Sequence, residues 1–249
     1  DKGRLMSNDS ITTLLKETRR FEPSEAFSKQ ARIGSREAYD ALYRESLDDP
    51  DTFWRREAKD LAFRTPWTTT LEWESPHAKW FLGATLNITE SCLDRFLGTP
   101  TQNKAALIWE GELGDTRTLT YAELHRETVL LADALTKHGI TKGDRVAIYM
   151  GMVPEAAVAM LACARVGAVH TVVFGGFSAD ALRDRIHDCQ AKLVITQDGG
   201  YRRGNVLALK EIVDNALAQP EAKSVEHTIV YRHLGDRFPV KMTEGRDLW

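Results

Sequence analysis

Between residues 145 and 231, short apolar runs alternate with segments of helix length. Expected strands cover residues 145–150, 169–174, 192–196 and 228–231, and expected helices cover residues 155–166, 179–189 and 206–217. Strands that are separated by a helix run parallel, because the chain crosses back over the sheet before it begins the next strand. The sequence therefore predicts an α/β fold with a parallel sheet and crossover helices.

Residues that favour helix ends support this assignment. Pro154 opens the helix of residues 155–166, Gly167 ends it, and Ser178 is placed to cap the following helix. These signals fix where the loops between strands and helices should lie.

Two β-rich runs precede the alternating region. Residues 104–112 and 117–120 are expected to form a hairpin, because a Gly-Asp turn signal lies between them. The helix expected over residues 120–138 begins with a capping-box pair, Thr120 and Glu123.

The N-terminal part has weaker patterns and is expected to be mostly helical or irregular. The expected helices cover residues 11–19, 35–47, 51–61 and 88–97. Residues 67–80 show little periodicity, so we expect an irregular segment that is held in place by its tryptophans. A base-stacking site is disfavoured there, because Glu72 and Glu74 lie where nucleic acid would require lysine or arginine.

Charge and cysteine content narrow the class of protein. A net charge of −3 argues against a nucleic-acid or membrane partner. No basic leader precedes an apolar run, and no run reaches membrane-spanning length. Cys92, Cys163 and Cys189 are widely spaced, which favours buried, unreactive thiols over a disulfide framework or a zinc site. We therefore expect a cytoplasmic protein.

Two loops that follow expected strands carry candidate binding residues. Ligands of parallel sheets bind beyond the carboxyl ends of strands. In the first loop, Phe174 can stack a planar ring, and Gly175 and Gly176 allow a ligand to approach the backbone. On its own, this loop is more typical of a tight turn with a packed phenylalanine.

The second loop, residues 198–204, places Arg202 and Arg203 among glycines and is expected to be flexible and cationic. Arginine suits bidentate phosphate recognition, although a solvated turn in which an arginine pairs with Asp198 is the simpler alternative. We expect the two loops to follow neighbouring strands and to share one edge of the sheet, where they would form a single site for a phosphorylated nucleotide.

Other polar residues are weaker candidates. His125 and His138 lack metal-ligand spacing, and His170 begins a buried-type strand, which favours a hydrogen-bonded core histidine over a base. The aspartates at positions 180, 184 and 188 share a helix face, but arginines lie between them, which favours a solvated face over a metal site. We assign no catalytic residue and no metal ligand.

Residues 143–178 (GDRVAIYMGMVPEAAVAMLACARVGAVHTVVFGGFS) resemble the acetyl-CoA synthetases of the adenylate-forming ligase superfamily. Residues 105–124 (AALIWEGELGDTRTLTYAEL) resemble the start of the AMP-binding domain of that family. Residues 81–97, with the core TLNITESCLDRFL, resemble its N-terminal domain, and the final EGRDLW also matches. The resemblance covers nearly all of the chain from Tyr39 onward.

The resemblance implies a function in two half-reactions. ATP and a short carboxylic acid give an acyl-adenylate and pyrophosphate, with magnesium neutralising phosphate charge, and the thiol of CoA then attacks the adenylate. The implied activity is that of an acetate–CoA ligase, with acetate, ATP and CoA as small-molecule substrates. Propionyl-CoA synthetase, a non-catalytic CoA- or nucleotide-binding module, and an inert scaffold fragment remain alternatives.

The resemblance also implies binding residues. Phe174, Gly175 and Gly176 match the surface that holds the CoA nucleotide, and Arg202 matches an arginine that holds the CoA 3′-phosphate. The family often has a second arginine three positions further on. Asn205 occupies that place here, and the adjacent Arg203 is the candidate to compensate.

The implied domains are an arm or partly disordered segment over residues 1–34, an acetyl-CoA-synthetase-type N-terminal domain over residues 35–98, and the first part of an AMP-binding domain over residues 99–249. The first few residues are expected to be an expression remnant. The TSGSTGKPKG-type loop and the C-terminal catalytic lysine of the family are not among these 249 residues. We therefore expect this polypeptide alone to be inactive.

Overall fold

The computed structural model describes residues 19–249, which form two compact units that divide between Ala58 and Lys59. The expected expression remnant and almost all of the helix expected over residues 11–19 lie outside the described residues. Among the helices in the described part of the chain, none has both the length and the apolar character needed to cross a bilayer.

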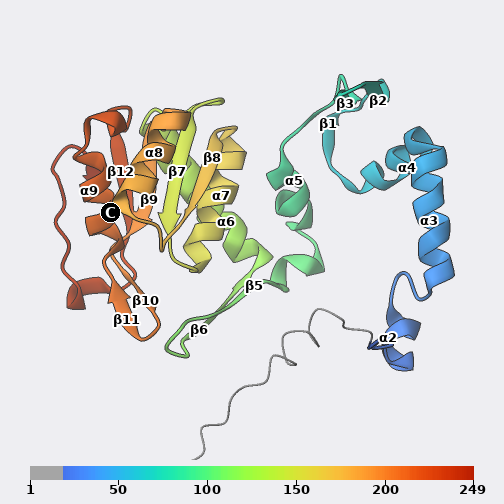
Figure 1. The fold of residues 1–249 in the computed structure, drawn as a ribbon, viewed down its shortest axis with the longest axis horizontal. Coiled ribbons are helices and arrows are strands. Elements are labelled where there is room, and N and C mark those ends of the chain that lie inside the picture. Colours follow the sequence, from blue (N-terminus) through green and yellow to red (C-terminus); the bar gives the residue numbers. More distant parts are fainter. Residues whose placement is uncertain (1–18) are drawn as a thin grey trace, which may run out of the picture. The chain divides into compact units, whose positions relative to one another are not determined.

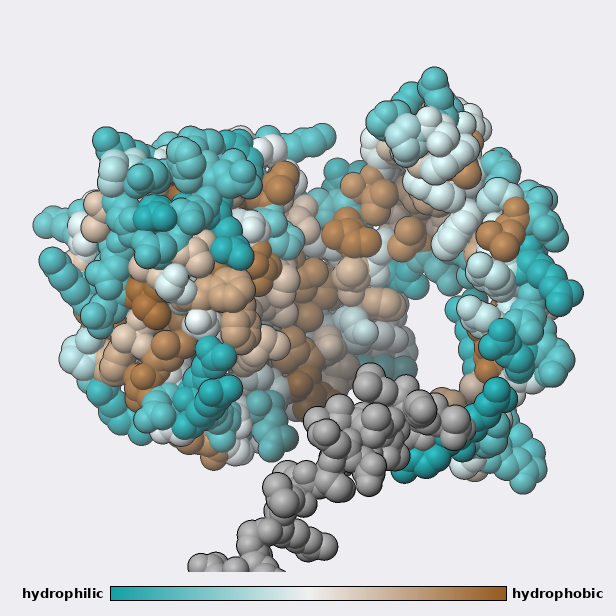
Figure 2. All heavy atoms as spheres, in the orientation of Figure 1, coloured by the Kyte–Doolittle hydropathy of each residue, from teal (hydrophilic) through white to brown (hydrophobic). Residues whose placement is uncertain are grey.

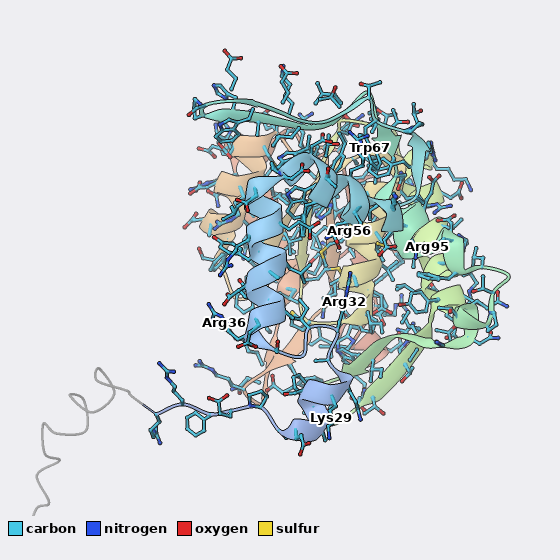
Figure 3. The ribbon with its side chains drawn as sticks, turned by 90° about the vertical axis from the view of Figure 1, so that its right-hand side faces the viewer. Lys29, Arg32, Arg36, Arg56, Trp67 and Arg95 are labelled. Carbon is cyan, nitrogen blue, oxygen red and sulfur yellow. The ribbon has the colours of Figure 1, made fainter. Side chains whose placement is uncertain are left out.

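The first unit contains the helices α2 (Glu25–Gln30), α3 (Arg36–Asp48) and α4 (Pro50–Glu57). Ser35 caps α3 by accepting from the N–H of Ala38, and Asp49 caps α4 by accepting from the N–H of Thr52. Near the start of α3, Arg36, which Figure 3 labels, forms an ion pair with Asp40 one turn further along the helix, at 2.9 Å. The helices expected over residues 35–47 and 51–61 are confirmed, although α4 ends at Glu57.

The second unit opens with two antiparallel strand pairs. A short 3-10 helix η1 (Ala58–Asp60) leads into β1 (Phe63–Thr65), which pairs with β4 (Thr85–Leu86), and β2 (Thr69–Glu74) pairs with β3 (His77–Leu82). The expectation of an irregular segment over residues 67–80 is therefore wrong, because most of these residues form β2 and β3. The chain then forms α5 (Ile88–Cys92), η2 (Asp94–Phe96) and η3 (Pro100–Asn103), so the helix expected over residues 88–97 is interrupted.

The hairpin of β2 and β3 has a simple physical basis. Leu71 lies opposite Trp80, and Glu72 lies opposite Lys79 on the other face, where the two charges are 3.2 Å apart. This alternation of apolar and charged residues is a period-two pattern. The abundance of aromatic residues concealed it, although Trp67 does pack against aromatic neighbours as expected.

A five-stranded parallel sheet forms the centre of the second unit (Figure 1). Its order is β13-β12-β9-β7-β8, with adjacent strands parallel. The bounds are β7 (Arg145–Met150), β8 (Val169–Phe174), β9 (Leu193–Gln197), β12 (His227–Tyr231) and β13 (Asp247–Leu248). The predicted parallel sheet is confirmed.

Helices and two hairpins complete this unit. The helices are α6 (Tyr121–Lys137), α7 (Pro154–Val166), α8 (Ala179–Cys189) and α9 (Leu209–Leu217), with the short 3-10 helices η4 (Pro220–Ala222) and η5 (Gly235–Arg237). The hairpins are β5 (Ala105–Glu110) with β6 (Thr116–Thr120), and β10 (Gly200–Arg202) with β11 (Asn205–Leu207). The predicted capping box at Thr120 and Glu123 is present.

Both faces of β7 are buried. Ile148 packs in a core that includes residues of α6 and α7, whereas Ala147 and Tyr149 pack in a core that includes residues of α8 and α9. Edge strand β8 instead exposes Val169 and Val172. Figure 2 shows hydrophobic residues gathered on the visible face of this unit, bordered by hydrophilic ones.

Four further expectations are wrong. β8 and β9 are not neighbours, because β7 lies between them. The expected flexible loop over residues 198–204 is largely the hairpin β10–β11, which also occupies the start of the helix expected over residues 206–217. Cys163 is buried, and burial raises the pKa of its thiol to about 12, but Cys92 is exposed.

Candidate functional site

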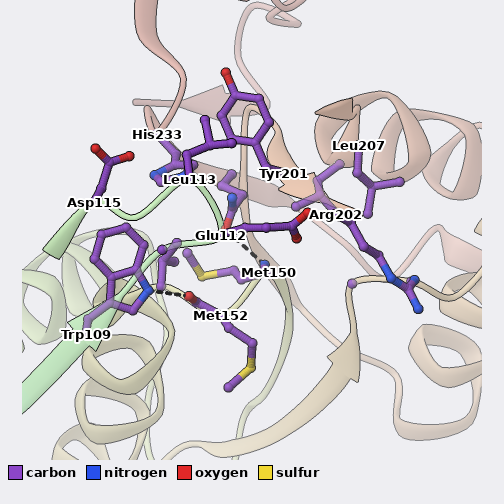
Figure 4. A pocket seen from close by; sticks show the side chains of 18 of the residues that line it. Trp109, Glu112, Leu113, Asp115, Met150, Met152, Tyr201, Arg202, Leu207 and His233 are labelled. Atoms are coloured by element: carbon purple, nitrogen blue, oxygen red, sulfur yellow. Dashed lines mark hydrogen bonds between the residues drawn. The ribbon is translucent and has the colours of Figure 1, made fainter. Parts of the chain in front are cut away.

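A cavity of about 240 Å³ lies at the carboxyl ends of the central strands (Figure 4). Met150, Phe174 and Gln197 are the final residues of β7, β8 and β9, and all three line it. The remaining walls come mainly from the hairpins β5–β6 and β10–β11. The cavity thus occupies the edge at which parallel sheets bind ligands.

The loop after β8 forms one wall and is held from beneath by Tyr149. This buried hydroxyl donates to the carbonyl of Phe177 at 2.7 Å and lies 3.4 Å from the carbonyl of Gly175. Burial raises the pKa of Tyr149 to about 12, although the charge of Arg202 acts in the opposite direction. The hydroxyl therefore stays protonated and remains a donor to the loop.

Glycine is required twice in this loop. A Cβ on Gly175 would lie 2.8 Å from the carbonyl oxygen of Met150. A Cβ on Gly176 would lie 1.9 Å from a guanidinium nitrogen of Arg202 and 2.9 Å from the ring of Phe174. The missing side chains allow the loop to pack against β7 and allow Arg202 to lie against the loop.

Arg202 reaches the loop from β10. Its guanidinium carbon lies 5.1 Å from the centre of the Phe174 ring, which is within the range of a cation–π interaction. Phe174 is 53% exposed, so the pair remains accessible to a ligand. The aromatic residue of the first expected loop and the basic residue of the second therefore meet, as the sequence predicted.

The other two expected residues lie at the hairpin turn. Arg203 has φ 53° and is exposed, and Asn205 pairs opposite Arg202 while its side-chain amide donates to the carbonyl of Arg203 at 3.2 Å. Phe174, Gly175, Gly176 and Arg202 line the cavity, but Arg203 and Asn205 are not among its lining residues.

Sequence reasoning missed the wall that β5–β6 supplies. The indole N–H of Trp109 donates to the carbonyl of Met152 at 2.6 Å, which joins this hairpin to the loop after β7 (Figure 4). Glu112 follows on the same hairpin and also lines the cavity. The position of Met152 could have been anticipated, because its loop follows the central strand, but nothing near Trp109 in the sequence indicated its partner.

Within residues 19–249, Asp198 forms no ion pair with an arginine. It is fully buried, and its carboxylate accepts from the backbone N–H groups of Gly199, His233, Leu234 and Gly235. The pairing of an arginine of the second loop with Asp198, which the simpler alternative required, is therefore wrong. Asp198 instead holds the loop after β12 at the same edge of the sheet.

The weaker candidates have structural partners. Arg183 pairs with Asp180 at 2.9 Å and with Asp184 at 2.6 Å, which confirms the solvated charged face. His125 lies 3.4 Å from Asp94, which Arg165 also binds. Across residues 19–249, no cluster of three histidine, cysteine or acidic residues could hold a metal ion.

Comparison with protein families gives two matches. Residues 96–247 match the family described as AMP-binding enzyme, and residues 39–92 match the family described as acetyl-coenzyme A synthetase N-terminus.

Similar proteins carry related names. A protein of Gemmatimonas aurantiaca named acetyl-coenzyme A synthetase is 53% identical over 96% of this chain, and one of Chlorobaculum tepidum with the same name is 49% identical over 98%. This chain spans only 36% of the length of each. The solved acetoacetyl-CoA synthetase of Streptomyces lividans has a TM-score of 0.79 and 31% identity, covering 91% of this chain and 36% of that structure.

Proposed function

This chain belongs to the family of AMP-binding enzymes, and from that membership we propose that it is the N-terminal part of an acetate–CoA ligase. The whole enzyme would convert acetate, ATP and CoA into acetyl-CoA, AMP and pyrophosphate through acetyl-adenylate. Relatives named acetyl-coenzyme A synthetase at 53% and 49% identity support acetate as the acid. Propionate remains the closest alternative acid.

We assign the CoA nucleotide to the cavity edge formed by Phe174, Gly175, Gly176 and Arg202, with Arg203 and Asn205 beside it. The observation that carries this assignment is the position of Arg202 over Phe174 and against Gly176. A guanidinium held there presents its remaining N–H donors to a phosphate, and the exposed backbone of Gly176 gives a planar base room to approach.

Magnesium would accompany ATP as part of the proposed first half-reaction. Among residues 19–249, no group of three or more histidine, cysteine or acidic residues is placed to hold a metal ion, whereas Mg²⁺ on ATP is held largely by the phosphates and needs only one or two carboxylates. The role that we propose for this part of the ligase is to bind CoA, with no catalytic residue assigned to it.

We further propose three domains, over residues 1–34, 35–98 and 99–249. The free cysteines support a reducing, cytoplasmic compartment. The proposed partners are acetate, ATP and CoA, without nucleic acid or membrane.

The test is an assay of the complete polypeptide that contains this chain. It should form acetyl-CoA and AMP from acetate, ATP and CoA, with a higher kcat/KM for acetate than for propionate. A preference for propionate would replace the acid, and CoA binding without turnover would favour a non-catalytic module. The 249-residue polypeptide alone should give no acetate-dependent ATP–pyrophosphate exchange, and robust exchange would contradict the division of roles.

A further inference from the structure

The hairpin that carries Arg202 is too small to hold its own position. Each of its strands has three residues, and Gly200 is its buried member. Isolated two-stranded hairpins are marginally stable in water. The tip, where Arg203 and Gly204 adopt φ 53° and 75°, therefore depends on contacts with other elements.

A cation–π contact and a hydrogen bond both hold the outer half of this hairpin. One is the stacking of Arg202 over Phe174. The other is a hydrogen bond of 2.6 Å in which the backbone N–H of Gly204 donates to the carboxylate of Glu112. Because the acceptor is ionised, this second bond is of the stronger, charge-assisted kind.

Glu112 is itself presented by a well-fixed turn. The N–H of Gly111 donates to the carbonyl of Asp115 at 2.7 Å, and that of Gly114 donates back to Gly111 at 2.9 Å. Trp109 joins the same hairpin to the loop after β7 through Met152. A series of hydrogen bonds thus connects the loop after β7 through β5–β6 to the tip of β10–β11.

We propose that Glu112 is a positioning residue for CoA, which sets the tip of β10–β11 so that Arg202 lies over Phe174 at the cavity edge. This inference rests on the proposed function, since it concerns the same phosphate contact. Glu112 acts through the backbone of Gly204 and needs no contact with the ligand. Pre-organising an arginine in this way reduces the ordering cost of binding.

The complete ligase tests this role through its kinetics with CoA and with 3′-dephospho-CoA. Replacing Glu112 with alanine should raise the KM for CoA about fivefold, because an exposed hydrogen bond contributes a net ~1 kcal/mol. The kcat, the KM for ATP and the KM for dephospho-CoA should each change by less than about twofold. Glu112→Gln keeps an oxygen that can accept from Gly204, so it should restore the KM for CoA.

Asp188→Ala, which removes one exposed carboxylate from α8, is the control and should leave the KM for CoA unchanged. The inference is overturned if Glu112→Ala leaves this KM unchanged, or if Glu112→Gln raises it as much as alanine does. An equal loss for dephospho-CoA would also overturn it, because the effect would then not pass through the phosphate contact. A wild-type enzyme that does not use CoA would refute the proposed function instead.

Discussion

The guanidinium carbon of Arg202 lies 5.1 Å from the centre of the Phe174 ring, although the two residues end different strands, β10 and β8. A cation over an exposed aromatic ring contributes roughly 0.5–1 kcal/mol, which orients the arginine without locking it. The pair therefore presents a charge that is positioned but still able to bind an anion.

Replacing Arg202 with alanine should weaken CoA binding by about 1.5–3 kcal/mol, as for a lost hydrogen bond to a charged group. The affinity for dephospho-CoA should hardly change, so the preference for CoA should disappear. Titration calorimetry of the complete enzyme measures both affinities. Arg237→Ala removes one exposed charge elsewhere and serves as the control. A preserved preference for CoA would exclude the 3′-phosphate role of Arg202.

Alanine at Gly176 should impair binding more than stability. The new Cβ would displace the mobile end of Arg202, so we expect about tenfold weaker CoA binding and a loss of less than about 1 kcal/mol in unfolding free energy. Alanine at Gly175 meets the backbone of Met150 instead and should cost about 1–3 kcal/mol of stability. Urea denaturation with CoA titration separates the two effects, and identical behaviour of both variants would contradict this explanation.

Tyr149→Phe tests the support beneath the loop after β8. It keeps the ring but leaves the carbonyl of Phe177 without its donor, so the free energy of unfolding should fall by about 1–2 kcal/mol. Tyr121→Phe is the matched control, because that hydroxyl donates no hydrogen bond to another described residue, and its effect should stay within about 0.5 kcal/mol. Equal effects in urea denaturation would show that the bond is unimportant.

Stability should fall in acid because of Asp247. Burial acts to raise the pKa of this carboxyl, but hydrogen bonds from Arg246 and Lys210 outweigh it and lower the pKa to about 2 from 3.8. A carboxyl whose pKa is lowered by folding stabilises the protein at pH values above the pKa that the group has in the unfolded state. This contribution, about 2 kcal/mol, should be present above pH ~4 and lost as the pH falls toward ~2. Urea-denaturation midpoints measured across that pH range show how the free energy of unfolding depends on pH.

Asp247→Asn should remove that acid dependence and destabilise the protein at neutral pH. The side chains of Lys210 and Asp247 are fully buried and lie 2.8 Å apart. Because Lys210 and Arg246 also pair with Asp214, losing the charge of Asp247 leaves two cations on one carboxylate, at a cost of about 1.5–3 kcal/mol. Asp236→Asn breaks an exposed pair with Arg232 and should cost less than about 0.5 kcal/mol. A variant that retains the wild-type pH slope would assign the titration to another group.

Local sequence patterns correctly predicted several helices and strands of the second unit. Strand β7 has the expected bounds, residues 145–150, and α7 differs from its expected range by one residue at its start. Ser178 caps α8 as expected. These elements are specified by nearby residues, through apolar periodicity and capping groups that act within a turn or two. The strands β2 and β3 also have alternating apolar and charged residues, but the many aromatic residues in this segment made the alternation hard to recognise.

The parallel α/β class and the family could be predicted from sequence patterns, which also led to the residues proposed to hold a phosphorylated nucleotide. The tertiary structure decided that β7 separates β8 from β9, that Arg202 lies over Phe174, and that Glu112 binds the turn at Gly204. The reason is physical: periodicity and caps record the environment of each residue along its own element, whereas strand order and contacts between hairpins depend on the packing of distant segments.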